Sequence, residues 1–114
     1  MDRIFELGTL LDTYGELLTD RQRSVAEQYA DENLSLAEIA EREGVTRQAV
    51  RDILIRAEGT LKEYEKGLHL ARKLEAYYSI LTSMERRFHD VELMPADRDS
   101  FDGYLVTLRE LWED

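Results

Sequence analysis

The sequence predicts an all-α fold in which a helix-turn-helix is followed by a long helix and a final short helix. Apolar residues recur at spacings of three and four, helix-capping residues separate these segments, and no stretch alternates with the period of a β-strand. There is one proline, and the six glycines are scattered, so no linker is indicated. We therefore expect a single domain over residues 1–114, with the helix-turn-helix in 19–58 and a packing or dimerisation part in 60–114.

The first predicted helix covers roughly residues 2–18, where apolar side chains share one stripe and acidic ones lie off it. Thr19 and Gln22 then have the spacing of a capping box, in which each residue satisfies an amide of the other. This box predicts a second helix over about 20–31, and Asn33 is expected just beyond its end.

A second capping box, Ser35 with Glu38, predicts a short helix that Gly44 ends, because glycine tolerates the left-handed conformation found after helices. Thr46 is expected to cap the next helix, with Arg47 as its first residue. Two helices that cross at about 100° after a short turn need a small contact residue, a glycine in the turn and apolar residues that lock them together. The residues expected to meet these needs are Ile39, Ala40, Gly44, Val45, Val50 and Ile53.

This spacing predicts a DNA-binding helix-turn-helix, and an αα-hairpin of a helical bundle is the alternative. On the second helix the polar residue types suit the major groove, since arginine can bind guanine and glutamine can bind adenine in bidentate fashion. A threonine cap and the amides at the N-terminus of this helix can hold a phosphate. Basic residues at the start of the predicted helix 20–31 could contact the DNA backbone. The candidate nucleic-acid-binding residues are Thr46, Arg47, Gln48, Arg51, Arg56, Arg21 and Arg23.

The second helix of the helix-turn-helix, the recognition helix, has an alternative interpretation, in which its arginines lie on a solvent-exposed face that binds no DNA. In that case they would form ion pairs with acidic neighbours, for which the sequence offers Glu43, Asp52 and Glu58.

The net charge of −10, from 25 acidic and 15 basic residues, argues as a whole against a polyanionic partner. Most of the acidic excess lies outside the helix-turn-helix, and residues 46–58 hold three arginines against two acidic residues. The charge therefore does not exclude double-stranded DNA. It predicts low non-specific affinity, because phosphate neutralisation supplies most of that affinity, and it leaves room for a basic protein partner.

Gly59 is expected to end the recognition helix, and Thr60 with Glu63 forms a third capping box that opens a helix reaching about residue 89. The apolar arc of that helix is too wide for one surface to cover. We expect the first helix and a last helix at about 98–112 to cover one part and a second copy of the chain to cover the other. A monomer in which both terminal helices suffice is the alternative. The predicted dimer interface consists of Leu61, Tyr64, Leu68, Leu74, Tyr78 and Leu81.

No motif indicates an enzyme, a metal or a cofactor. His69 and His89 lie twenty residues apart, and no carboxylate pair has the spacing that would complete a histidine metal site. No glycine-rich phosphate loop is present. The acidic stretch 97–103 fails as a calcium loop because Arg98 stands where the first ligand should be. Helix capping by Asp97, Asp99 or Ser100 is the simpler role for this stretch.

Cysteine is absent, which excludes disulfides and thiolate metal sites and is compatible with a reducing compartment. The longest aliphatic runs are short and the N-terminus alternates charged with apolar residues, so we expect no signal peptide, no transmembrane span and no membrane partner.

Three segments, 14–22, 31–40 and 46–52, make the chain resemble the YlxM family over roughly residues 5–65. These are small bacterial helix-turn-helix proteins whose DNA-reading part is similar to region four of sigma factors. The resemblance implies a winged-helix-like or sigma region four-like three-helix unit and a cytoplasmic protein linked to the signal recognition particle pathway. It implies a regulator that binds DNA, or an accessory protein that binds the particle's RNA or GTPase. Many relatives have tyrosine where Arg51 stands, so no base preference is carried over.

Overall fold

The computed structural model describes residues 3–113, with side chains from residue 6 onward; residues 1–2 and 114 of the predicted domain lie outside this range. No strand occurs in this range, so the all-α prediction is confirmed and no wing accompanies the helices described. None of the helices in 3–113 is long and apolar enough to cross a membrane. In chain order the elements are α1 (Arg3–Tyr14), a 3-10 turn (Gly15–Leu17), α2 (Asp20–Ala30), α3 (Leu36–Glu43), α4 (Arg47–Leu68), α5 (Leu70–Asp90) and α6 (Pro95–Glu110).

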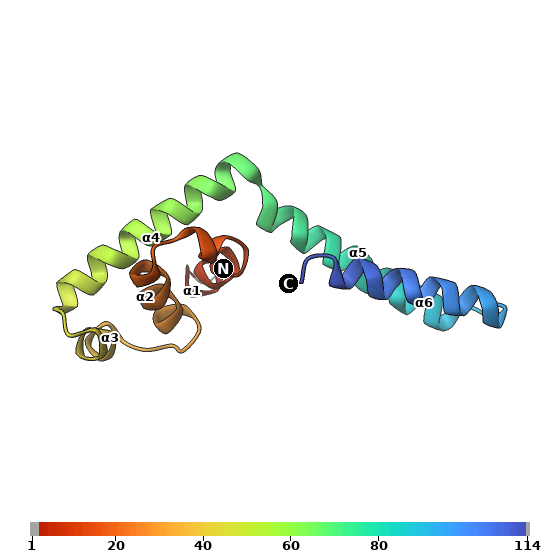
Figure 1. Cartoon of the computed structure of the whole chain (residues 1–114), viewed down its shortest axis with the longest axis horizontal. Helices are drawn as coiled ribbons and strands as arrows, with labels where there is room; N and C mark the ends of the chain where they lie inside the picture. The colour runs from red at the N-terminus through yellow and green to blue at the C-terminus, as the bar shows by residue number, and fades with distance from the viewer. Residues whose placement is uncertain (1–2, 114) are drawn as a thin grey trace. The chain divides into compact units, whose positions relative to one another are not determined.

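The chain divides into two compact units, Met1–Ala71 and Arg72–Asp114, where the sequence predicts one domain. In unit 1, α1 packs on α2 and α4, and α4 also contacts α2 and α3, as Figure 1 shows. Tyr14, Ile39, Leu61, Val25 and Val50 are its largest fully buried side chains. Unit 2 consists of the rest of α5 and of α6.

Side-chain caps form at the starts of α2 and α3, where the sequence predicts them. The Gln22 amide donates to Thr19 Oγ1 at 3.2 Å, and the Glu38 amide donates to Ser35 Oγ at 3.1 Å. Both glutamine and glutamate side chains accept the reciprocal bond, which completes each capping box. The starts of α2 and α3 therefore follow from residues three positions apart.

Left-handed backbone marks the end of two helices at the expected residues. Gly44 has φ 67° directly after α3, and Asn33 has φ 55° three residues after α2. The first helix is shorter than predicted, because α1 ends at Tyr14 and a 3-10 turn takes up the following residues. Glycine at position 15, inside the predicted helix, is among the poorest helix formers.

Gly44→Ala is expected to lower the free energy of unfolding by about 1–2 kcal/mol, because a Cβ is disfavoured in left-handed backbone. Gly59→Ala is the matched control, since Gly59 lies inside α4 with nothing within 4 Å of an added Cβ. That change should raise the free energy of unfolding by roughly 0.5–1 kcal/mol. Urea unfolding measures both variants, and a stabilising Gly44→Ala change would contradict the turn geometry.

Two boundaries predicted for the long helix are wrong. Gly59 does not end the recognition helix, and no helix begins at Thr60, because α4 runs without a break to Leu68. Ala57 and Leu61, on either side of the glycine, are fully buried in the core. Burying such side chains outweighs the cost of about 1 kcal/mol for a glycine inside a helix.

The helical break falls instead at His69, which has φ 54°. The Tyr14 hydroxyl donates to Glu65 Oε1 at 2.6 Å and accepts the Leu70 amide at 3.0 Å. The same Glu65 oxygen accepts the Ala71 amide at 3.0 Å. Burial, and then the contact with the Glu65 carboxylate, raise the pKa of Tyr14. Side chains of α1 and α4 thus satisfy amides at the start of α5 that no helical carbonyl could reach.

In unit 2, α5 and α6 form an antiparallel hairpin (Figure 1). The Tyr77 hydroxyl donates to the Leu108 carbonyl oxygen at 2.7 Å. Nearer the turn, the Phe88 and Phe101 rings stack with their centroids 4.8 Å apart. Contacts between aromatic side chains and backbone thus join the two helices along their length.

The last helix begins at Pro95, earlier than the predicted start at about residue 98. Proline is favoured at the first helical position, because its missing N–H would have no helical acceptor there. The capping role expected of acidic and hydroxyl residues in this stretch is wrong, since the N-cap is Met94 and no side chain caps the helix. The residues concerned lie inside α6: Asp97, Asp99 and Ser100.

The predicted dimer interface is not one continuous surface. Leu61 is fully buried in unit 1 and Leu81 is buried in unit 2, so the prediction is wrong for both: their own unit already covers them. Tyr64 packs against the Tyr14 ring, with centroids 5.8 Å apart. The other predicted interface residues keep part of their surface exposed: Leu68, Leu74 and Tyr78.

Candidate nucleic-acid interface

The turn between α3 and α4 brings two helices together as a helix-turn-helix requires. Ile39, Ala40 and Val50 are buried, and Val45 and Ile53 are partly buried against the same core. The Ala40 carbonyl oxygen accepts the amides of the two residues that follow α3, which closes the helix at the turn. The beginning of α4 is thereby held at the surface of unit 1.

Four exposed residues lie on one side of α4. At about 100° per residue, Arg47, Gln48, Arg51 and Ile55 fall within an arc of about 100°. We call these four residues the outer face of α4. Arg56 is exposed as well, but it lies about 140° around the helix from Arg51 and points in another direction.

Neither arginine of the outer face has a partner in the described part of the chain, where no hydrogen bond or ion pair involves Arg47 or Arg51. Two of the acidic residues that the sequence offers as ion-pair partners for these arginines have other partners. Gln48 Nε2 donates to Asp52 Oδ1 at 3.0 Å, and Lys62 forms an ion pair with Glu58 at 2.9 Å. The guanidinium groups at the start of α4 therefore face solvent with their donors free, as recognition of a base edge requires.

Thr46 and the basic residues of α2 have different roles in the structure. Thr46 Oγ1 accepts the Ala49 amide at 3.0 Å, so the hydroxyl caps α4. Arg21 Nη2 donates to the Glu43 carbonyl oxygen at 3.5 Å, which places this guanidinium beside the turn. The structure thus brings Arg21 close to the N-terminus of α4.

Arg23, by contrast, forms an ion pair with Glu27, with Nε 2.8 Å from the carboxylate oxygen. This hydrogen bond and the Glu27 charge raise the pKa of the Arg23 guanidinium. Contact with DNA phosphate would compete with the ion pair, so Arg23 is less suited to DNA contact than Arg21.

Acidic groups on α3 limit the positive potential of this surface. Glu38 accepts the Ser35 amide, and the hydrogen bonds from the Ser35 amide and hydroxyl lower the pKa of Glu38. Glu41 is exposed on the same helix and Glu43 is partly exposed. The basic residues at the start of α4 therefore lie in an acidic surrounding.

Sequence reasoning missed Ile55, which is 50% exposed on the outer face. An apolar side chain there suits the methyl group of thymine. Its signal was present in the sequence, because Ile55 lies outside the three-four spacing of the stripe that faces the core. That stripe consists of Val50, Leu54, Ala57 and Leu61.

No group of three His, Asp or Glu side chains that could hold a metal occurs among the described residues. The two histidines belong to different units.

The chain is similar to known proteins over most of its length. A family model described as "Putative helix-turn-helix protein, YlxM / p13 like" matches residues 1–97. The UPF0122 protein of Clostridium novyi is 42% identical over 91 residues, which cover 80% of this chain and 78% of that protein. The UPF0122 protein of Symbiobacterium thermophilum is 36% identical over 98 residues, 86% of this chain and 92% of that protein.

A further relative, the UPF0122 protein of Desulforamulus reducens, is 52% identical over 73 residues, which cover 64% of this chain and 62% of that protein. The family match includes all of the helix-turn-helix and of α5. The chain therefore belongs to the UPF0122 family of helix-turn-helix proteins.

Proposed function

We propose that the protein binds double-stranded DNA, reads base sequence with the outer face of α4 in the major groove, and acts in this way as a cytoplasmic regulator of transcription. The observation that carries the proposal is the exposed start of α4, where Arg47 and Arg51 have no partner among the described residues. A helix-turn-helix places the N-terminal residues of its second helix against base edges.

Each residue of the outer face has a base edge that suits its chemistry. Arg47 and Arg51 would donate to N7 and O6 of guanine, and Gln48 would form a bidentate contact with adenine, giving up its bond to Asp52. Ile55 would contact the methyl group of thymine. These contacts would supply the sequence specificity.

Backbone contacts would position the domain on the duplex. Arg21 beside the turn and the amides at the start of α4 after Thr46 are suited to phosphate oxygens. We assign no base contact to Arg23, which is paired with Glu27, or to Arg56, which points away from the outer face. Because so few cations contribute, non-specific affinity should be low.

Selection of duplexes from a random library by the full-length protein tests the proposal. We expect a short motif to be enriched that contains guanine and thymine. Replacing its thymines with uracil should weaken binding, because the methyl group that Ile55 contacts is lost. Absence of any enriched motif would contradict sequence reading by α4.

The net charge of −10 favours a second candidate, an accessory protein of the signal recognition particle that binds the particle's RNA or GTPase. An acidic protein is electrostatically suited to dock on a basic protein component. Purification from a bacterial lysate with and without nuclease separates the two functions. Particle components retained after nuclease would support protein docking, whereas co-purified DNA fragments without the particle would support DNA reading.

A further inference from the structure

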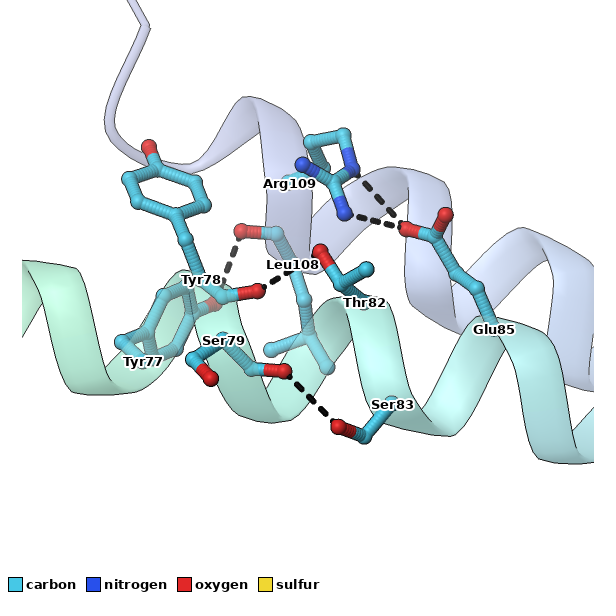
Figure 2. A network of polar contacts seen from close by, with 8 residues as sticks. All are labelled: Tyr77, Tyr78, Ser79, Thr82, Ser83, Glu85, Leu108 and Arg109. Atoms are coloured by element: carbon cyan, nitrogen blue, oxygen red, sulfur yellow. Dashed lines mark hydrogen bonds and ion pairs between the residues drawn. The ribbon is translucent and has the colours of Figure 1, made fainter.

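The hairpin of α5 and α6 has a polar side. Glu85 of α5 accepts a hydrogen bond from Arg109 Nε of α6 at 2.9 Å, as Figure 2 shows. His89, Asp102 and Val106 line the same side, around a cavity of about 570 Å³. Charged groups here already have partners on the neighbouring helix or face water.

The opposite side of the hairpin is apolar. Ile80 and Tyr104 each lie five residues before one member of the Glu85–Arg109 ion pair, and so about 140° around their helices from it. Met84 lies one turn after Ile80, and Leu111 lies two turns after Tyr104. Ile80, Tyr104 and Leu111 are 61%, 63% and 65% exposed. We call Ile80, Met84, Tyr104 and Leu111 the apolar face of the hairpin.

Two helices alone do not bury enough of their apolar surface to form a stable unit. Among the described residues of unit 2, only Leu81 and Leu105 are buried. The aromatic side chains between the helices, such as Phe88 and Phe101, remain partly exposed. A unit of this size requires further cover, since small helical hairpins lack the core needed to offset conformational entropy.

We infer that a second copy of this chain covers the apolar face, so that two hairpins form a four-helix bundle. Two-fold symmetry places identical faces against each other, and each hairpin supplies the apolar surface that the other lacks. The inference concerns α5 and α6 and does not depend on the proposed DNA binding.

Charges beside the apolar face select how the two hairpins pair. Lys73 and Arg87 lie seven residues before and after Ile80 on the same stripe of α5, so the apolar face has a basic rim at both ends of that stripe. Asp97 lies seven residues before Tyr104 on the stripe of α6, so the rim at that end of α6 is acidic. A two-fold axis along the helices places α5 beside the other copy's α6, where unlike charges meet. An axis across the helices would bring the two basic rims together.

Sedimentation equilibrium of the full-length chain tests the inference. We expect a mass twice that of the 13.3 kDa chain. The variant Ile80→Glu should raise the dimer dissociation constant at least tenfold. Val106→Glu is the matched control, because it adds the same charge to an exposed apolar position on the polar side, and it should remain dimeric. A wild-type mass of one chain, or equal dissociation of the control, would overturn the inference.

Charge exchange tests the pairing without changing the apolar face. One chain carries Arg87→Glu and the other Asp97→Lys, and circular dichroism verifies that both keep their helix content. When they are mixed at low salt, heterodimers should exceed the statistical half of all dimers, because both of their rim contacts join unlike charges. Random mixing would overturn the pairing of α5 with the other copy's α6.

Discussion

Leu61→Ala is expected to lower the free energy of unfolding of unit 1 by about 2–5 kcal/mol. Leu61 is fully buried in the cluster that also contains Tyr14, Leu54 and Ala57. Removing its isopropyl group loses apolar burial and leaves a cavity that the surrounding helices fill only in part. Urea unfolding followed by circular dichroism measures the loss.

Leu68→Ala is the matched control on the same helix. Leu68 is 54% exposed, so the same truncation should change the free energy of unfolding by no more than about 0.5 kcal/mol. The sequence places both leucines in one dimer interface. Equal effects of the two changes on stability would show that the core does not depend on Leu61 in the way its burial implies.

The double change Arg47→Ala/Arg51→Ala should reduce affinity for a selected duplex by roughly thirtyfold to 10⁴-fold. The range follows from about 1–3 kcal/mol of discrimination for each bidentate contact to guanine. Both side chains are exposed and have no partner in the described part of the chain, so stability should change by less than about 0.5 kcal/mol. Fluorescence anisotropy with labelled duplex measures affinity, and thermal unfolding checks the fold.

Arg56→Ala/Lys66→Ala removes the same charge from the same helix away from the start of α4. This control pair should weaken binding only slightly, because neither residue belongs to the outer face. If both double variants lose affinity equally, the effect is one of net charge, and base reading by Arg47 and Arg51 is contradicted.

Capping chemistry made the first half of the fold predictable. Thr19, Ser35 and Thr46 each satisfy an amide three residues later, and Gly44 takes the left-handed conformation that ends α3. These interactions span a single turn, so the residues that form them can be recognised in the sequence without knowledge of what packs nearby.

The candidate site was predictable only in part. The sequence places Arg47, Gln48 and Arg51 at the start of a surface helix, and the structure finds them exposed on one side of α4. The sequence could not show that Arg23 would pair with Glu27 on its own helix, because an exposed arginine can form either an ion pair or a phosphate contact. Ile55 was missed because the residue types expected to read a base edge were the polar ones on this helix.

By itself, the sequence determined an all-helical chain with a helix-turn-helix, because helix caps, the turn glycine and the three-four spacing act between residues a few positions apart. Tertiary structure alone decided that α4 continues through Gly59 and that the chain breaks at His69. The break is held by the hydroxyl of Tyr14, which accepts an amide 56 residues further along the chain. Burial decided likewise that Leu61 belongs to a core and Ile80 to a surface, because both have the same apolar chemistry and differ only in what lies against them.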